Sequence, residues 1–301
     1  MIPHVPPEAE AALDWLALTD ALAEGHLRPR ARLGDTLLRR GDDALLSRAA
    51  WIDGLGMLVK TASVFPGVSP SVNGAVTVFS DETGAAEATL DFHLVTKWKT
   101  AGDSLLAARR LAPPGAERIA IVGAGAVARS LREAYGAAFP GARFEVWNRS
   151  GDKALALAAD YPDTEAAGDL EAMVRGAQIV TVATMATAPV VMGEWLSPGS
   201  HLDLIGAYAP HMREADDLAL TRGSVFLDSR ETVLGHIGEL DDPIRRGVLQ
   251  ASDIKADLYE PERFGRRSGE EITVFKNGGG AHLDLMTARY VMAAWAAAGG
   301  G

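Results

Sequence analysis

Cysteine is absent from this chain of 301 residues. Its absence excludes disulfide bonds, thiolate zinc sites and a cysteine nucleophile. A redox enzyme with this sequence would therefore depend on a bound cofactor for its redox chemistry. The histidines are scattered rather than set at ligand spacing, so we expect no catalytic metal. Those considered for a metal site are His201, His211, His236 and His282.

Long apolar runs and large basic clusters are also missing. No segment approaches the roughly 18 to 20 apolar residues that cross a bilayer, and the acidic first residues lack the pattern of an export signal. We therefore expect a cytoplasmic protein that has no membrane partner. The formal net charge of −11 argues against nucleic acid as a partner, because such binding relies on clustered lysine and arginine.

The first part of the chain predicts an α+β domain. Apolar residues fall at helical spacing from Pro7 to about Leu22, and residues 30–92 form a series of segments that are rich in Val, Thr and Phe. Helical spacing returns from Val95 to Leu111 and stops at two prolines and a glycine. We place a domain boundary there, so that the first domain covers residues 1–112.

The remainder of the chain alternates short apolar strands with helical segments. The predicted strands are RIAIV, FEVW, QIVTVA, HLDLIG, SVFLD and ITVF. Such alternation indicates parallel strands joined by helical crossovers. The sequence thus predicts an α/β fold with a Rossmann-type doubly wound dinucleotide-binding domain over residues 113–284. The tail from about Leu283 to Ala298 is helical, and we expect residues 285–301 to pack back on the first domain.

A glycine-rich turn follows the first of these strands, in the string RIAIVGAGAVARS. In a dinucleotide fingerprint, Gly123 permits the tight turn, Gly125 lets the backbone approach a pyrophosphate, and Ala128 lets the helix pack closely on the strand. The alternative is a purely structural turn, since glycine and alanine are abundant here. The predicted cofactor-binding residues of this turn are Gly123, Ala124, Gly125, Ala126, Val127 and Ala128.

The second strand ends where the adenosine ribose of a dinucleotide should lie. NAD enzymes usually place Asp or Glu there, whereas this chain has Asn148, Arg149 and Ser150. A guanidinium forms charge-assisted, forked hydrogen bonds to a phosphate, so these residues favour NADP(H), with NAD(H) as the alternative cofactor. The other interpretation of Arg149 is a solvated loop residue.

Small and polar residues at the ends of later strands predict the nicotinamide side of the cofactor site. They allow the backbone to approach a bound ring, although a simple turn explains the last two equally well. These residues are Ala183, Thr184, Thr187, Gly206, Asn277 and Gly278.

Seven strings spread over most of the chain resemble the ornithine cyclodeaminase and mu-crystallin family. In order they are VKTASVFP, DETG, TKWKTAGDSLLAARRLA, the glycine turn, EWLSPGSHLDLIGAYAPHMREAD, VFLDSRE and EITVFKNGGGAHLDLM. The resemblance implies a homodimer built by the first domain, a Rossmann second domain and a substrate pocket between the two domains.

The resemblance also implies that basic side chains hold a substrate carboxylate, and the matching positions are Arg30, Lys60 and Lys99. Cations in a partly closed cleft would hold a small amino or imino acid in register with a nicotinamide. Lys60 lies in an apolar strand, where a charge is costly without a partner. Lys99 shares its helix with Lys97, so one of the two is free to face solvent. Ordinary surface lysines are the alternative for both.

Two departures from the family pattern bear on the substrate. Lys99 replaces an arginine and loses its bidentate fork. The string GAYAPHM places Tyr208 where cyclodeaminases carry an aspartate for the substrate amine, and Met212 where they carry a basic residue. These departures count against ornithine and favour a cyclic imine. We predict an NAD(P)H-dependent reductase of 1-pyrroline-2-carboxylate or 1-piperideine-2-carboxylate, giving proline or pipecolate. Its catalytic residues would be Lys60, Lys99 and Tyr208, the tyrosine donating a proton, ordering a water or only packing.

Three other functions stay open from the sequence. One is an ornithine cyclodeaminase, in which bound NAD oxidises ornithine and recovers the hydride after ammonia is lost. The second is a ligand carrier that binds NADPH without turnover. The third is an opine-like or alanine dehydrogenase with the same fold.

Overall fold

A computed structural model describes residues 2–300, which divide into two compact units. The first unit holds the residues up to Gly102 together with those from Gly280 onward, and the second unit is Asp103–Gly279. The boundary lies ten residues before the predicted 112/113 limit, because helix α2 (Phe92–Leu111) runs through it. The last turns of α2 belong to the second unit, where Ser104 donates a hydrogen bond to Asp203.

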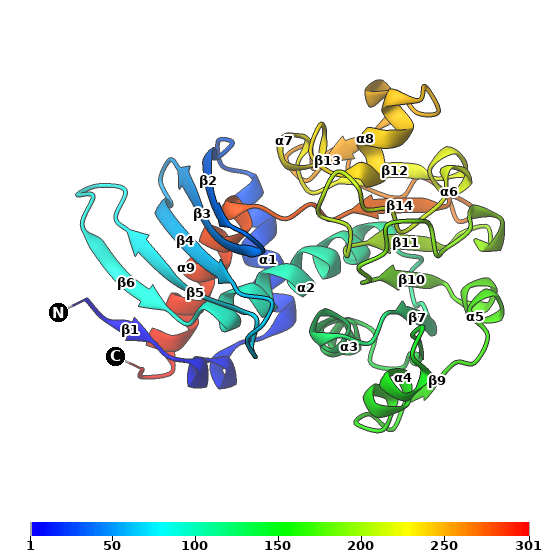
Figure 1. The fold of residues 1–301 in the computed structure, drawn as a ribbon, viewed down its shortest axis with the longest axis horizontal. Coiled ribbons are helices and arrows are strands. Elements are labelled where there is room, and N and C mark those ends of the chain that lie inside the picture. The colour runs from blue at the N-terminus through cyan, green and yellow to red at the C-terminus, as the bar shows by residue number, and fades with distance from the viewer. Residues whose placement is uncertain (1, 301) are drawn as a thin grey trace. The chain divides into compact units, whose positions relative to one another are not determined.

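Among the described residues, the first unit contains a six-stranded sheet in the order β1-β6-β5-β4-β3-β2 (Figure 1). Strand β1 pairs with β6 in parallel, and the other neighbours are antiparallel. The strands are β1 (His4–Val5), β2 (Arg32–Arg40), β3 (Asp43–Ile52), β4 (Gly56–Val64), β5 (Val72–Phe79) and β6 (Ala86–Leu90). This confirms the predicted run of strands.

The prediction of one continuous helix from Pro7 to Leu22 is wrong, because the structure has two helices there. A 3-10 helix, η1 (Pro7–Ala12), comes first, and α1 (Trp15–His26) starts separately. Asp14 is extended, and its side chain accepts a hydrogen bond from the backbone N–H of Ala17. An N-cap of this kind satisfies an amide that has no partner in the first helical turn, so it fixes the start of α1.

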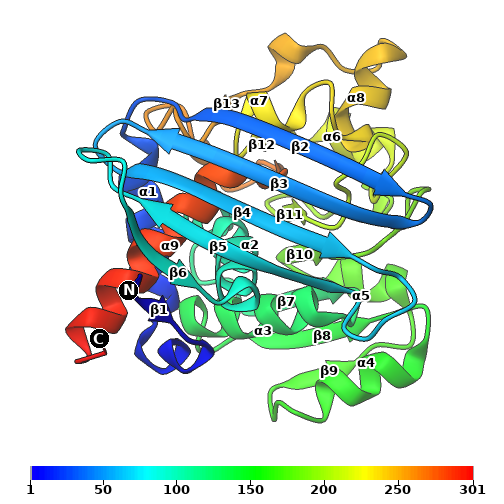
Figure 2. The same ribbon diagram turned by 60° about the vertical axis from the view of Figure 1, so that its left-hand side comes forward.

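Helix α9 (Ala281–Ala297) contacts β3, β4, α1 and η1 of the first unit (Figure 2). Side chains alternate across a strand, so the residues facing these helices are buried, as at Leu58 and Val78. The opposite face of the sheet exposes Leu38, Leu45 and Val59.

Among the described residues, the second unit contains an eight-stranded parallel sheet in the order β13-β12-β14-β11-β10-β7-β8-β9 (Figure 1). Its strands are β7 (Arg118–Val122), β8 (Arg143–Trp147), β9 (Thr164–Ala166), β10 (Ile179–Val182), β11 (His201–Leu204), β12 (Ser224–Leu227), β13 (Ala256–Asp257) and β14 (Thr273–Lys276). The helices are α3 (Ala126–Ala138), α4 (Gly151–Ala158), α5 (Leu170–Gly176), η2 (Gly193–Trp195), α6 (Asp217–Arg222), α7 (Arg230–Val233), α8 (Gly238–Arg245) and η3 (Ala251–Asp253).

The strand order confirms the predicted Rossmann-type fold. Counted along the chain from β7, the sequence β9-β8-β7-β10-β11 is the 3-2-1-4-5 order of a doubly wound sheet. The order reverses between β7 and β10, and ligands of such sheets bind at the carboxyl ends of the strands beside that point. The central strands are apolar and buried, as at Val122, Val180 and Leu204, which gives these strand ends a rigid base.

Candidate functional site

The turn from β7 to α3 has the backbone that a dinucleotide requires. Gly123 has a φ of +116°, and a Cβ placed there would lie 2.4 Å from the carbonyl oxygen of Ala183. A Cβ on Gly125 would meet no atom within 4 Å, and Gly125 caps α3 without any side-chain hydrogen bond. The first amides of α3 therefore face an open space that suits a pyrophosphate.

Ala128 completes this turn. Its side chain is fully buried, as the third small position of a dinucleotide fingerprint requires for close helix packing. Ala124 is half-buried, and Ala126 and Val127 are exposed beside Gly125. The residues of the turn thus fit the phosphate part of a nicotinamide dinucleotide.

The end of β8 presents a short polar segment. The side-chain amide of Asn148 donates to the carbonyl oxygen of Ser150 at 3.0 Å, which fixes the turn. Arg149 and Ser150 are both exposed, and Ser150 caps α4 without a side-chain hydrogen bond. The segment offers a guanidinium and a hydroxyl and contains no carboxylate.

One buried carboxylate joins the ends of β10 and β11. Glu214 Oε1 accepts hydrogen bonds from the backbone N–H of Thr184 at 2.8 Å and from its hydroxyl at 2.9 Å. Oε2 accepts from the backbone N–H of Gly206 at 2.6 Å and of Ala207 at 2.9 Å. The predicted residues Thr184 and Gly206 are thereby brought together at the carboxyl ends of β10 and β11, beside the switch point between β7 and β10.

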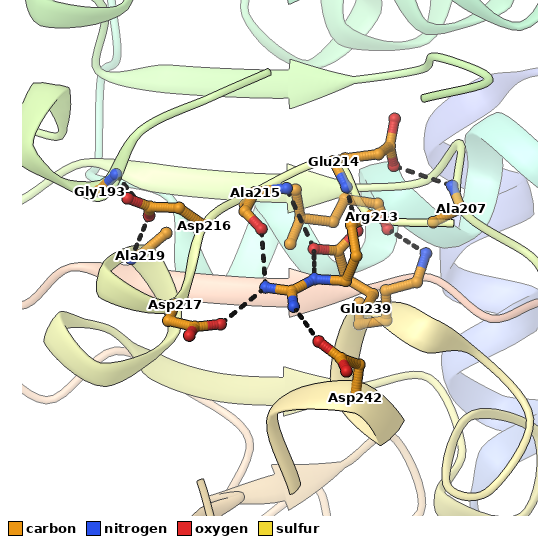
Figure 3. A network of polar contacts seen from close by, with 12 residues as sticks. Gly193, Ala207, Arg213, Glu214, Ala215, Asp216, Asp217, Ala219, Glu239 and Asp242 are labelled. Atoms are coloured by element: carbon orange, nitrogen blue, oxygen red, sulfur yellow. Dashed lines mark hydrogen bonds and ion pairs between the residues drawn. The ribbon is translucent and has the colours of Figure 1, made fainter. Parts of the chain in front are cut away.

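The position of Glu214 is fixed from behind by a second buried carboxylate. Glu239 accepts hydrogen bonds from the backbone N–H of Glu214 at 2.6 Å and of Ala215 at 3.0 Å (Figure 3). Arg213 lies beside Glu239 at 3.7 Å and donates to Asp242 at 2.8 Å. Burial raises the pKa of Glu239 above its usual range.

A further carboxylate holds the glycines after β14. Asp228 accepts hydrogen bonds from the backbone N–H of Gly278 at 2.9 Å and of Gly279 at 2.6 Å. Burial raises the pKa of Asp228 to about 6, against the opposing effect of these N–H groups. Beside it, the side-chain amide of the buried Asn277 donates to Ser104 Oγ at 3.1 Å. Asn277 and Gly278 are therefore held in a defined turn.

Lys276 is fully buried at the end of β14. Its Nζ donates to the carbonyl oxygens of Leu204 at 2.8 Å and Asn277 at 2.7 Å. Its positive charge lowers the pKa values of four buried carboxyl groups against the larger effect of burial. They are Asp203, Glu214, Asp228 and Glu239.

Two predicted residues of the second unit lie at the surface. Thr187 is exposed, and the side chain of Tyr208 is 63% exposed on the turn after β11. Ala183 is half-buried and donates its backbone N–H to the carbonyl of Val122 at 2.8 Å. Ala183 therefore lies against the glycine turn, where its carbonyl oxygen would meet a Cβ on Gly123.

In the first unit, Lys60 forms a buried ion pair. Its Nζ lies 2.8 Å from Asp284 Oδ1 and 4.9 Å from the centre of the Phe92 ring. Burial lowers the pKa of Lys60 below its usual range, while Asp284 opposes that shift. Burial alone would raise the pKa of Asp284, but the nearby cations, with Lys60 first, bring it below its usual range. Each partner thus favours the charged form of the other, and the two side chains form an ion pair at 2.8 Å.

Other cations gather around this pair. Arg48 on β3 is directly opposite Lys60 in the sheet register. The pKa of the buried His282 is far below its usual range, first because of burial and then because of cations that include Lys99, Arg48 and Arg30. Lys99 is half-buried and Arg30 is exposed. The three predicted carboxylate-binding residues thus share one positive environment.

The described residues contain neither a metal-binding cluster nor a membrane-spanning helix. Across residues 2–300, no three His, Cys, Asp or Glu side chains are grouped so that they could hold a metal ion. Over the same residues, no helix has the length and apolar character that a membrane crossing requires.

The comparison with protein families decides the classification. A model of the ornithine cyclodeaminase/mu-crystallin family matches residues 60–299. The chain belongs to this family. The resemblance drawn from the seven strings is thereby confirmed, and the matched segment includes Lys60, the glycine turn and Glu214.

Individual relatives agree with the family. The chain is 47% identical over 296 residues to the Delta(1)-pyrroline-2-carboxylate reductase of Paracoccus denitrificans, covering 94% of each chain. It is 33% identical over 228 residues to the ketimine reductase mu-crystallin of Mus musculus, covering 75% of this chain and 71% of the relative. The fold matches that of the Thermococcus litoralis Delta(1)-pyrroline-2-carboxylate reductase in complex with NADH and L-proline, with a TM-score of 0.91, 23% identity and coverage of 100% and 99%.

Several charged residues of these sites were not among the sequence predictions. They are Arg48, Glu214, Asp228, Glu239, Lys276 and Asp284. Arg48, Asp228, Lys276 and Asp284 lie in otherwise apolar or glycine-rich strings, where a charge needs a partner. Glu214 and Glu239 stand among other charged residues, so their strings carry no such signal.

Proposed function

We propose that this protein is an NAD(P)H-dependent reductase of a cyclic 2-imino acid. The substrates we favour are 1-pyrroline-2-carboxylate, which would give proline, and 1-piperideine-2-carboxylate, which would give pipecolate. The names of the Paracoccus and mouse relatives support reduction of a carbon–nitrogen double bond.

The main support for a cyclic imine comes from the turn after β11, which offers no carboxylate that a ligand could contact. Tyr208 occupies the position expected for an amine-binding aspartate. The one carboxylate of residues 205–214, that of Glu214, has both oxygens occupied by four donors of the chain. A substrate ammonium would find no carboxylate on this turn, whereas a cyclic imine does not require one.

The second unit would hold the dinucleotide. The first amides of α3 and the open space at Gly125 would receive the pyrophosphate, and the segment 148–150 would contact the adenosine ribose. When bound, the reduced nicotinamide supplies a hydride for the imine carbon. Thr184, Gly206 and Asn277 would border the nicotinamide end of the site.

The first unit would hold the substrate carboxylate. Lys60 and Lys99, with Arg30, would bind its oxygens by charge-assisted hydrogen bonds. Asp284 favours the charged form of Lys60 against the effect of burial and fixes its Nζ by the 2.8 Å contact. Tyr208 has an exposed hydroxyl, and we propose that it donates a proton to the imine nitrogen or orders a water that does so.

A substrate panel tests this function. Purified protein is incubated with 1-pyrroline-2-carboxylate, 1-piperideine-2-carboxylate or pyruvate plus ammonia, with NADH and NADPH in turn, and absorbance at the nicotinamide band is followed. We expect turnover of a cyclic imine. Ammonia release from ornithine in the presence of NAD, without turnover of any imine, would instead identify a cyclodeaminase.

The exposed Arg149 supports a preference for NADPH, because its guanidinium can pair with a 2′-phosphate. We expect Arg149→Ala to raise the Kd for NADPH about tenfold, as for loss of one charge-assisted phosphate contact, and to leave the Kd for NADH unchanged. Fluorescence titration with each nucleotide measures this. Arg143→Ala, at the other end of β8, is the matched control and should change neither Kd. Equal loss of both nucleotides in Arg149→Ala would contradict the proposal.

A homodimer is supported by an apolar patch on the sheet of the first unit, on the face away from α9. The patch consists of Leu38, Leu45, Trp51 and Val59, all exposed and all on one face by the strand register. Exposed apolar patches of this kind mark protein interfaces. A second copy of the chain, placed over this patch, would cover its four side chains.

We expect Leu38→Glu to convert the dimer into a monomer, because it buries a charge in the proposed interface. Light scattering at micromolar concentration measures the mass. The matched control is Leu155→Glu on α4, since both leucines are 61% exposed and Leu155 lies outside the patch. A dimer that survives Leu38→Glu would place the interface elsewhere.

A further inference from the structure

The turns that follow β10 and β11 are fastened to each other by a single side chain. Glu214 is 0% exposed, and each of its carboxylate oxygens serves a different turn. Oε1 takes the backbone N–H and hydroxyl of Thr184, and Oε2 takes the backbone N–H groups of Gly206 and Ala207. Such an arrangement uses a charged acceptor to align four donors that would otherwise repel one another.

We propose that Glu214 is a positioning residue that sets the shape of the nicotinamide end of the dinucleotide site. This inference rests on the proposed function, because it takes the turns at Thr184 and Gly206 as the border of that site. Glu214 itself has no oxygen left to contact a ligand, so it acts through the two turns.

The packing around Gly206 shows how closely the turns depend on this carboxylate. A Cβ on Gly206 would lie 2.1 Å from the carbonyl oxygen of Thr184 and 2.4 Å from Glu214 Oε1. The two turns therefore meet without a side chain between them, and the carboxylate bridges them beside the backbone hydrogen bond from the Gly206 N–H to the carbonyl oxygen of Val182 at 3.2 Å. A shift of about 1 Å in such a border is enough to impair a site that depends on orientation.

The backbone of Glu214 is held in turn by two other segments. Its carbonyl oxygen accepts from the N–H of Val190 at 2.9 Å and of Val191 at 3.0 Å, and its N–H donates to Glu239 at 2.6 Å. Figure 3 shows the backbone N–H groups of Glu214 and Ala215 both directed at the Glu239 carboxylate, while the Glu214 side chain points toward Ala207. The backbone of Glu214 is therefore fixed, and this sets where its carboxylate lies relative to the two turns.

Titratable groups on two elements face this carboxyl group. Lys276 lies on β14 and stabilises the charged form, whereas Glu239 on α8 disfavours it. Burial, the largest effect, raises the pKa of Glu214 to about 7. The ionised form can accept all four hydrogen bonds, but a protonated carboxyl directs an O–H at one of the donors. The bridge should therefore weaken as the pH falls from 8 to 6.

The variant Glu214→Gln keeps the size of the side chain and turns its amide nitrogen toward one pair of donors. We expect the Kd for NADH, measured by nicotinamide fluorescence at pH 8, to rise about tenfold or more, as for a buried donor that loses its acceptor. Glu214→Asp keeps the charge and shortens the reach, so it should weaken binding as well. It provides the test should the glutamine variant fail to fold.

A pH series separates positioning from a general loss of structure. NADH is the probe because it has no 2′-phosphate that titrates in this range. In the wild-type protein we expect NADH affinity to fall as the pH is lowered from 8 to 6, since Glu214 takes up a proton. In Glu214→Gln this dependence should be reduced, because the amide does not titrate.

Asp216→Asn is the matched control. Asp216 is also a carboxylate that accepts two backbone N–H groups, those of Gly193 and Ala219, but it contacts neither turn. We expect it to bind NADH as the wild type does. Wild-type affinity in both Glu214 variants, or an equal loss in Asp216→Asn, would overturn the inference. A wild-type protein that binds NADH but reduces no imine would instead refute the proposed function and leave the positioning result intact.

Discussion

Replacing Lys60 by glutamine should lower kcat/KM for the cyclic imino acid by about a hundredfold to a thousandfold, as for truncation of one member of a buried charge pair. The reason is that Lys60 is the buried cation of the first unit, with its Nζ fixed 2.8 Å from Asp284. The Kd for NADPH should stay unchanged, because the dinucleotide would be held by the second unit. Steady-state kinetics and a fluorescence titration measure the two quantities.

Folding must be separated from catalysis in this experiment. Lys60→Gln leaves Asp284 buried without its cation, which costs about 3–5 kcal/mol when one partner of a buried pair is removed. The double variant Lys60→Gln with Asp284→Asn removes both charges and should recover much of that stability without recovering activity. Lys97→Gln is the control, since Lys97 pairs with Glu10 at a half-exposed site. Near-normal turnover in a folded Lys60→Gln protein would remove Lys60 from the site.

The second large effect concerns the glycine turn, where two neighbouring glycines should respond differently to alanine. Gly123→Ala is expected to destabilise the protein by about 2–5 kcal/mol, through strain at positive φ and overpacking. The physical cause is the φ of +116° and a Cβ that would lie 2.4 Å from the carbonyl oxygen of Ala183. Thermal unfolding measures this loss.

Gly125→Ala is the matched comparison. Gly125 has a φ of −89°, and a Cβ there meets no atom of the chain within 4 Å, so Tm should hardly change. The Kd for NADPH should nevertheless rise about tenfold or more, because the new methyl group fills the space in which the backbone approaches a pyrophosphate. A Gly125→Ala protein that binds NADPH normally, or a Gly123→Ala protein of normal Tm, would contradict this account.

The sequence was informative wherever a local pattern has one physical solution. The string RIAIVGAGAVARS predicted a strand, a tight turn and a helix, and the structure has β7, Gly123 and α3 in that order. The sequence was less informative where the same pattern is compatible with two different local structures. The segment from Pro7 to Leu22 has helical spacing throughout, yet Asp14 caps a new helix and divides it.

For the candidate sites as well, the sequence identified some charged residues and missed others. Lys60 was predicted from the family resemblance, and its place in an apolar strand indicated that it needs a partner, but that partner, Asp284, lies 224 residues away in the sequence. Glu214 was passed over in the string READ, since an acid there has the composition of a surface turn. Only the approach of Thr184 and Gly206 shows that this carboxylate is buried and bridges two strands.

The amino-acid sequence by itself determined the order of strands and helices in the second unit, the glycine turn and the family. These follow from periodicity, from the unique backbone freedom of glycine and from strings of adjacent residues. Tertiary structure decided which charges meet: Lys60 with Asp284, Glu214 with two strand ends, and Lys276 among buried carboxyl groups. Such contacts depend on distances in space, and the linear sequence does not give these distances, because they are set only when the chain folds into its sheets.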